Sequence, residues 1–270
     1  MNHEPEGVYL PTDDPDTYES TPMANAGWYE QGQHGGALAA LITGHVDRIP
    51  TLADMQIARV TVEIFRVVPL VPLTIKTKVV REGKRIQKIR ADVTDPEGTL
   101  LSMASIQRLR VADLPLPEGA ETPDVSLAAP SDVGSFDPDT WGVGKAGKVM
   151  FHRNAIEIRE IFGGFSTPGP GAIWTRLTKP IIAGRANSPV QRVIAAADFC
   201  NGVSLSLGDD WVFMNSDLTV HISRYPEGEW VALDAESHYS ELGRGVAAGS
   251  LWDQNAWLGR SAQTLFLDHA

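Results

Sequence analysis

Asp198 is the residue best suited to chemistry by type and position, because it places a carboxylate in an apolar helical stripe. It follows Ile194 by four residues and Val190 by eight, so the three share one face of a predicted helix. It also lies late in that helix, where its charge meets the negative end of the helix dipole. Both facts are unfavourable for a mere surface charge, so a functional role for the carboxylate stays open. In the alternative, the helix ends a turn earlier and Asp198 is a solvated cap residue.

Two glutamines stand in strand rows that are otherwise largely apolar. Gln263 alternates with small and apolar residues in the last predicted strand, and Gln107 has the same setting in the strand of residues 99–110. An inward-facing glutamine costs free energy unless its amide finds hydrogen-bonding partners. Both amides could satisfy backbone groups near the seam of a duplicated sheet. We prefer this structural role for Gln107, whereas for Gln263 a chemical role stays open.

The sequence His34-Gly35-Gly36 opens another predicted helix, over residues 37–49, which Pro50 ends. The N–H groups at a helix start lack intrahelical partners and bind anions, and glycine lets a ligand approach the backbone closely. The segment is therefore a candidate binding site for a negatively charged or polarised group. A glycine turn with His34 as a polar cap is the compatible structural alternative.

The elements that must position these residues occur twice. The first half has the helix 37–49 and then four alternating strands in a predicted meander, at 59–68, 73–81, 84–94 and 99–110. The second half has strands at 149–161 and 172–178, a helix, and four strands at 212–224, 229–240, 244–252 and 257–268. The second helix begins at Ser188-Pro189-Val190-Gln191, a capping box with proline at the first helical position. Each helix is predicted to be wrapped by an antiparallel sheet.

The two halves also align residue by residue in places. Residues 60–66 lie over 218–224 with an offset of 158, and residues 101–107 lie over 257–263 with an offset of 156. The identities are few, but their order and spacing agree. We interpret the chain as an internal duplication in which one hairpin has changed length.

Several short motifs carry a resemblance to a known family, and they lie in both halves: Gly27-Trp28, His34-Gly35-Gly36, Ala197-Asp198-Phe199, Asn215-Ser216-Asp217-Leu218-Thr219 and Ser261-Ala262-Gln263. Together with the repeated helix and sheet, they resemble the acyl-CoA thioesterase superfamily, in its TesB-like acyl-CoA thioesterase II tandem type. The resemblance implies an α+β double hotdog, with each antiparallel sheet wrapped around a central helix. The expected organisation is an N-terminal hotdog at 17–110, a linker at 111–147 and a C-terminal hotdog at 148–270.

The same resemblance implies a thioester hydrolase that acts on fatty acyl-CoA by water attack. Asp198, Asn215 and Gln263 fall on the catalytic positions, and the amides of Gly35 and Gly36 would hold the oxyanion. His34 and Thr219 are the further candidates for substrate binding. Asn215 departs from the family, which has a hydroxyl residue there, and Thr219 on the same predicted strand face is the candidate to compensate.

The Asn215 departure keeps a second hypothesis open, a non-catalytic hotdog that binds acyl-CoA or lipid. A hotdog hydratase or dehydratase acting on enoyl thioesters ranks last, since no Asp/His signature of that chemistry is present.

Bulk properties limit the remaining possibilities. The net charge of −11 argues against a nucleic-acid partner, and no apolar stretch reaches the eighteen residues of a membrane span. The only cysteine is Cys200, so no intrachain disulfide can form and a reducing cytoplasm is expected. We expect no metal and no cofactor: the histidines lack zinc-site spacing, and the dinucleotide-like string at 142–147 has no strand before it or helix after it. The resemblance also predicts a homo-oligomer joined through sheet edges.

Overall fold

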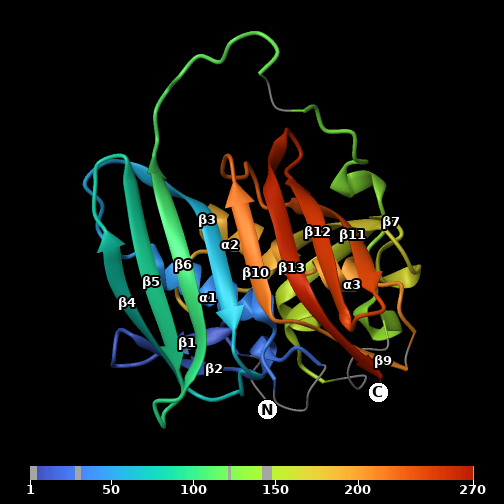
Figure 1. Ribbon diagram of the computed structural model, residues 1–270, viewed down its shortest axis with the longest axis horizontal. Coiled ribbons are helices and arrows are strands. Elements are labelled where there is room, and N and C mark those ends of the chain that lie inside the picture. The colour runs from blue at the N-terminus through green and yellow to red at the C-terminus, as the bar shows by residue number, and fades with distance from the viewer. Residues whose placement is uncertain (1–4, 28–31, 121–122, 142–147, 209, 270) are drawn as a thin grey trace.

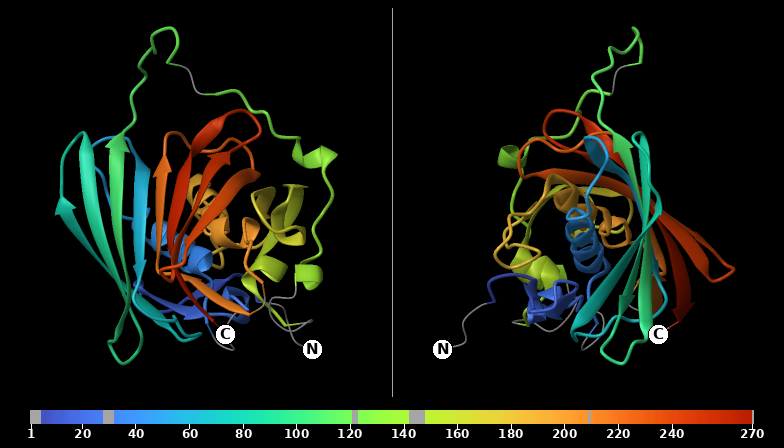
Figure 2. Two further views of the ribbon diagram at one scale, coloured as in Figure 1. Left: turned by 45° about the vertical axis from the view of Figure 1, so that its right-hand side comes forward. Right: turned by 90° about the vertical axis from the view of Figure 1, so that its left-hand side faces the viewer.

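The computed structural model describes residues 5–27, 32–120, 123–141, 148–208 and 210–269. Strands from both halves form one antiparallel sheet of 13 strands, which curves around two central helices (Figures 1 and 2). The helices lie against the concave face of the sheet, where the apolar core is concentrated. This arrangement brings elements from the two halves of the chain into one core.

The first half contains β1 Tyr9–Pro11, β2 Thr17–Ser20, α1 Gly35–Val46, β3 Met55–Ile64, β4 Leu73–Arg81, β5 Ile86–Thr94 and β6 Leu100–Arg110. The second half contains β7 Ile156–Phe162, β8 Gly171–Leu177, α2 Pro189–Ala197, the short α3 Cys200–Val203, β9 Trp211–Asn215, β10 Asp217–Ile222, β11 Val231–Ser240, β12 Arg244–Trp252 and β13 Trp257–His269. Short helical turns occur at Pro22–Ala24, Pro130–Asp132, Pro138–Trp141, Phe151–Ala155 and Gly164–Ser166.

The two central helices pack closely against each other. Helix α1 begins at Gly35, two residues before the predicted start, and ends at Val46 rather than Ile49, since Asp47 caps it. Helix α2 begins as predicted at its capping box, where the Ser188 N–H donates to Gln191 Oε1 at 2.9 Å. Gln191 Nε2 also donates to the Ala40 carbonyl of α1 at 3.1 Å. A Cβ on Gly44 would lie 2.3 Å from that Nε2, so glycine permits the close approach of the helices.

The strand order differs from the predicted meander. The path through the sheet is β1-β2-β4-β5-β6-β3-β10-β13-β12-β11-β8-β7, so β3 lies beside β6 and β10 beside β13. Strands β3 and β10 are thereby placed at the centre, where they pair with each other. This order joins the two sheets and leaves neither strand with an open edge.

The β3–β10 pairing supports the internal duplication. Thr61 lies directly opposite Thr219, its equivalent at an offset of 158, and the neighbouring pairs are arranged symmetrically about them. Thr61 also lies opposite Ser105 on β6, and Thr219 lies opposite Ala262 on β13. The structural offset between β6 and β13 is therefore 157, one residue more than the sequence alignment predicted.

This one-residue shift places Gln107 on the opposite face of the sheet from the predicted one. Because side chains alternate across a strand, a shift of one residue exchanges the two faces of the sheet. The buried residues of β6 are Leu101, Ser102, Ala104, Ile106 and Arg108, whereas Gln107 lies in the partly exposed row. The prediction that Gln107 and Gln263 share one setting is wrong. Gln263 does face inward and is 1% exposed.

Two predicted strands are interrupted. The predicted strand 212–224 is divided at Ser216 into β9, which pairs with the end of β13, and β10, which pairs with β3 and β13. The predicted strand 149–161 starts with the helical turn Phe151–Ala155, and only β7 is extended. Both interruptions matter for the site, because they place Asn215 and the Phe151 ring against it.

Part of the predicted linker is bound to the second half. We call residues 128–139 the strap. Its Ala128 carbonyl accepts from Trp174 Nε1 at 2.8 Å, its Pro130 carbonyl accepts from Arg159 Nη1 at 2.6 Å, and its Phe136 N–H donates to a carbonyl of β7 at 2.9 Å. Figure 1 shows the linker leaving β6 and returning beside β7. The glycine-rich string at 142–147 and Trp28 lie outside the described residues.

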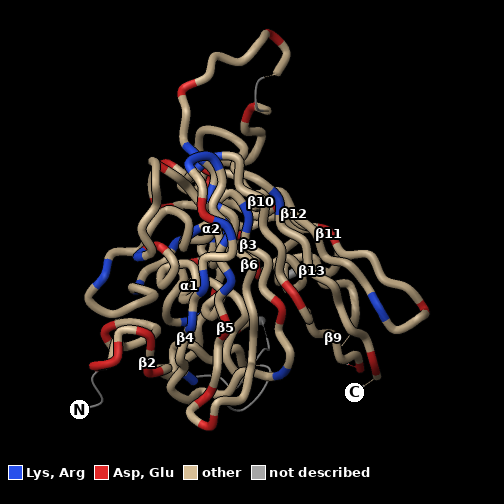
Figure 3. The backbone as a smooth tube through the Cα atoms, turned by 60° about the vertical axis from the view of Figure 1, so that its left-hand side comes forward, with Lys and Arg blue, Asp and Glu red and all other residues tan. Residues whose placement is uncertain are grey.

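Neither charge nor hydropathy divides the fold into further parts. Acidic and basic residues are both scattered over the backbone (Figure 3). Within the described ranges, no helix is both long enough and apolar enough to cross a membrane.

Lowering the pH is expected to destabilise the fold through His45, which lies at the end of α1 and is 2% exposed. Its Nδ1 lies 3.0 Å from the Tyr18 hydroxyl, and burial beside Arg48 lowers its pKa to about 4. The unfolded chain, with a histidine pKa near 6.5, therefore binds the proton first. The free energy of unfolding should fall by about 1 kcal/mol per pH unit between roughly pH 6.5 and 4.

Urea titrations across that pH range measure this slope. His45→Gln should flatten it, whereas the same change at the exposed His238 should leave it as in the wild type. An unchanged slope in His45→Gln would show that other groups set the acid sensitivity.

Candidate active site

The Asp198 carboxylate lies where the C-terminus of α2 meets the N-terminus of α1. Helix α2 ends at Ala197 and Asp198 is its C-cap, so the helix does end before this residue. The cap is nevertheless not solvated, since the Asp198 side chain is only 6% exposed. The positive end of the α1 dipole faces this carboxylate and offsets the negative end of α2.

Four nitrogen atoms surround the two carboxylate oxygens of Asp198. Asn215 Nδ2 and Gln263 Nε2 donate to Oδ1 at 2.9 and 2.8 Å. The Gly36 N–H donates to Oδ2 at 2.5 Å, and His34 Nδ1 lies 3.0 Å from the same oxygen. A buried carboxylate needs such donors to remain charged. The structure thus joins five of the seven predicted site residues, His34, Gly36, Asp198, Asn215 and Gln263, and Gly35 adjoins them.

Gln263 is held by its own network, which fixes the orientation of its amide. Its Oε1 accepts from the Asn201 N–H at 3.2 Å, and its Nε2 also donates to the Asp198 carbonyl at 3.1 Å. Two residues earlier on the inward row of β13, the Ser261 hydroxyl donates to the Ala197 carbonyl at 2.9 Å. Ser261 and Asn201 therefore support the end of α2. Neither residue was predicted to belong to the site, although Ser261 shares the inward row of Gln263.

The two glycines are required by the closeness of the carboxylate. A Cβ on Gly35 would lie 2.9 and 3.0 Å from the Asp198 oxygens, and a Cβ on Gly36 would lie 3.0 Å from Asp198 Cβ. The Gly36 N–H is occupied by Asp198 itself, because the helix start binds the nearest anion. The Gly36 amide was expected to donate to a substrate oxygen, but in the structure it donates to Asp198 instead.

His34 is buried beside the carboxylate rather than open to solvent. Its ring lies between Phe151 and Phe199, with centroid distances of 5.0 Å to each. Nδ1 also lies 3.1 Å from the Gly36 nitrogen, but one nitrogen cannot both accept from Gly36 and donate to Asp198. A protonated Nδ1 that donates to Asp198 avoids placing two acceptors 3.0 Å apart, and it leaves the Gly36 amide to the carboxylate.

Thr219 is the predicted site residue that the structure does not bring to Asp198. Its neighbours Leu218 and Val220 are buried, so the Thr219 side chain lies on the opposite face of β10. Its hydroxyl donates to Thr61 Oγ1 at 3.3 Å. Thr219 therefore does not supply the hydroxyl that Asn215 lacks. The break at Ser216 explains the difference, because it interrupts the alternation on which the sequence prediction rested.

The Cys200 thiol adjoins this cluster but is not suited to nucleophilic chemistry. Burial raises the pKa of the Cys200 thiol to about 12, so this thiol is not a nucleophile near neutral pH. Among the described residues, no group of three or more His, Cys, Asp or Glu side chains could hold a metal ion. The polar groups around Asp198 are suited to orienting a neutral molecule beside a carboxylate base.

A repeated helix wrapped by one curved sheet, with a carboxylate where the helix ends meet, defines a tandem hotdog protein. The family models agree with this class: the acyl-CoA thioesterase N-terminal domain matches residues 25–107 and the C-terminal domain matches residues 130–267. The chain belongs to the acyl-CoA thioesterase family. The predicted α+β double hotdog is confirmed.

Solved structures share this fold across nearly the whole chain. A thioesterase candidate from Novosphingobium aromaticivorans is 19% identical, with 97% of this chain and 98% of that chain covered and a TM-score of 0.73. A hot dog fold protein from Alicyclobacillus acidocaldarius is 18% identical, with 95% of each covered and a TM-score of 0.70. The acyl-CoA thioesterase II TesB2 of Mycobacterium marinum is 13% identical, with 96% and 94% covered and a TM-score of 0.67. No curated protein matches the chain.

Proposed function

We propose that the protein hydrolyses the thioester bond of fatty acyl-CoA, with Asp198 as the general base. The observation that carries the proposal is the buried Asp198 carboxylate, which Asn215 and Gln263 orient from neighbouring strands. Membership of the acyl-CoA thioesterase family supports the reaction class. A carboxylate beside two amides is suited to bind and deprotonate one water molecule.

The proposed reaction is a direct attack of water on the thioester carbonyl. Asp198 takes a proton from the water as the new carbon–oxygen bond forms, and the amides of Asn215 and Gln263 hold the carboxylate and the water in line. The carbon–sulfur bond then breaks, and the proton passes from Asp198 to the thiolate of the leaving group. The products are a free carboxylic acid and a thiol, and no acyl-enzyme forms.

The developing oxyanion is assigned to the start of α1. The Gly36 amide is occupied by Asp198, so we propose the Gly35 amide as the donor. Gly35 is the first residue of the helix, where an N–H has no intrahelical acceptor. His34 is proposed to hold the carboxylate in place beside this amide rather than to contact substrate through a free ring edge.

Thiol release from a panel of short-, medium- and long-chain acyl-CoAs tests the proposal. We expect release that is linear with enzyme concentration. Acyl-CoA binding by calorimetry without any release would contradict it and would favour the alternative that Asn215 motivates, a hotdog that binds acyl-CoA without hydrolysing it. The cytoplasmic location, the choice of CoA as carrier and a homo-oligomeric assembly stay predictions.

Gly35→Ala is expected to lower kcat by at least about tenfold, because its new Cβ would meet both Asp198 oxygens and displace Oδ1 from Asn215 and Gln263. The measurement is thiol release on a substrate that the wild type hydrolyses. Gly134→Ala, on the strap, is the matched control, since its Cβ would have no neighbour within 4 Å. Equal rates in both variants would show that the carboxylate position does not limit turnover.

A further inference from the structure

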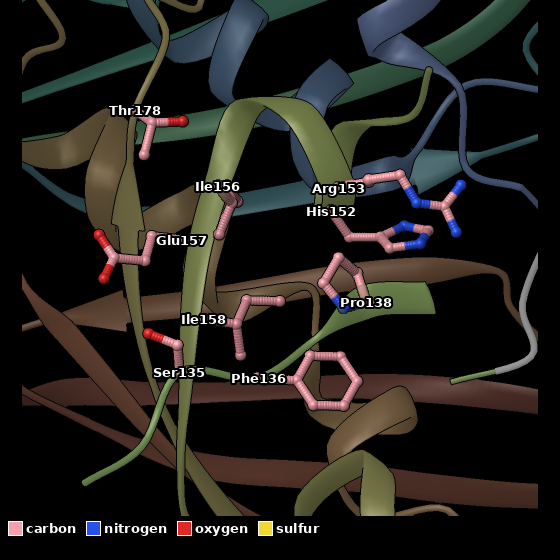
Figure 4. A pocket seen from close by; sticks show the side chains of 9 residues that line it. All are labelled: Ser135, Phe136, Pro138, His152, Arg153, Ile156, Glu157, Ile158 and Thr178. Carbon is pink, nitrogen blue, oxygen red and sulfur yellow. The ribbon is translucent and has the colours of Figure 1, made fainter. Parts of the chain in front are cut away.

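A pocket of about 300 Å³ lies between the strap and β7, apart from the polar cluster at Asp198. It is lined by Ser135, Phe136, Pro138, His152, Arg153, Ile156, Glu157, Ile158 and Thr178. Figure 4 shows Ile156 and Ile158 facing Phe136, Pro138 and His152 across it. Its volume is at the lower end of the range of about 300–1,000 Å³ that is usual for small-ligand sites.

The lining is suited to a neutral, apolar group. Arg153 is paired with Asp139 at 2.6 Å, and Glu157 is paired with Arg159 at 2.9 Å and with Arg176 at 2.5 Å. Burial lowers the pKa of His152 to about 3, so this ring is neutral near pH 7. A charged ligand would find each of these lining charges already compensated, whereas an alkyl group would contact Phe136, Pro138 and the two isoleucines.

One layer of packed aromatic rings separates this pocket from the Asp198 carboxylate. The Phe136 ring lies 5.0 Å from Phe165, Phe165 lies 6.1 Å from Phe199, and Phe199 lies 5.0 Å from the His34 ring. His34 Nδ1 is in turn 3.0 Å from Asp198. The pocket and the polar cluster therefore lie on opposite sides of one side-chain layer.

We propose that this pocket receives the far end of the substrate's acyl chain, so that the strap helps to select chain length. The inference rests on the proposed function, because it places the thioester at Asp198. The strap is suited to this role, since Trp174, Arg159 and the edge of β7 hold its backbone in place. Selection would then depend on a segment that lies outside both helix–sheet repeats.

Thr178→Trp tests the proposal by filling the pocket from an exposed position of its lining. In the wild type, KM should fall by up to about fourfold per added methylene until the pocket is full. In Thr178→Trp, KM for the longest good substrates should rise by about tenfold or more relative to KM for acetyl-CoA. Ser135→Trp fills the pocket from the strap side and should act alike.

Ser131→Trp is the matched control, since Ser131 is exposed on the strap but does not line the pocket. Equal effects of Thr178→Trp on all chain lengths, no effect at all, or the same effect from Ser131→Trp would overturn the proposal.

Calorimetry with S-alkyl-CoA thioethers, which cannot be hydrolysed, separates the pocket from the reaction. Affinity that rises with alkyl length in the wild type and not in Thr178→Trp would support the pocket even in a protein without thioesterase activity. If the enzyme is active but its affinity does not depend on alkyl length, the proposed role of the pocket is rejected and the proposed thioesterase function is not.

Discussion

Asp198→Asn is expected to lower kcat for thioester hydrolysis by about 10²–10⁴-fold, with the fold intact. Asparagine keeps the volume of the side chain but is not a base at neutral pH, and it would offer an amide nitrogen to donors that now surround an anion. Of the proposed changes this has the largest effect on activity, since it removes the group that takes the proton from water. Thiol release and the thermal unfolding midpoint, measured side by side, check the two parts of the prediction.

Asp268→Asn is the matched control, because Asp268 is an exposed carboxylate on β13, the same strand as Gln263. It should retain the wild-type rate. Turnover within a few-fold of wild type in Asp198→Asn would reject Asp198 as the base, whatever the control does.

Arg108→Met is expected to lower the free energy of unfolding by about 3–5 kcal/mol. Arg108 is 4% exposed and closes the C-terminus of α1 from the inward row of β6. Its guanidinium donates to the carbonyls of Val46 and Ile49 at 2.6 and 2.8 Å and to Gln87 Oε1 at 3.0 Å. Methionine fills much of the volume but leaves these buried acceptors unsatisfied. Urea denaturation measures the loss.

The control for this change is Arg110→Met, two residues along the same strand and exposed. It should change stability by no more than about 0.5 kcal/mol. Folded Arg108→Met should hydrolyse acyl-CoA at the wild-type rate, since Arg108 lies at the end of α1 that is remote from Gly36. A loss below about 1 kcal/mol would show that water replaces the guanidinium at the helix end.

The C-termini of the two central helices, α1 and α2, are thus bound by different side chains. At the end of α1, the inward row of the last strand supplies Arg108, which binds backbone carbonyls. At the end of α2, the inward row of β13 supplies Gln263, which binds both the backbone and the carboxylate of Asp198. The duplicated fold therefore has a structural helix end at the C-terminus of α1 and a candidate catalytic helix end at the C-terminus of α2.

Local pattern was sufficient to predict much of this protein. The apolar periodicity around Asp198, the capping box at Ser188, the inward row of Gln263 and the repeat offset of 158 are all properties of short segments, and each is found in the structure. Such features depend on side chains a few residues apart, which periodicity and capping chemistry describe directly.

The tertiary structure alone decided how these segments meet. Gly36 and Asp198 are 162 residues apart, and only the packing of α1 against α2 makes the glycine amide a donor to the carboxylate rather than to a ligand. The break at Ser216 turned Asn215 toward Asp198 and Thr219 away from it. The one-residue shift between β6 and β13 separated Gln107 from Gln263. Register and strand order arise from pairing between distant strands, so no local window of the sequence contains them.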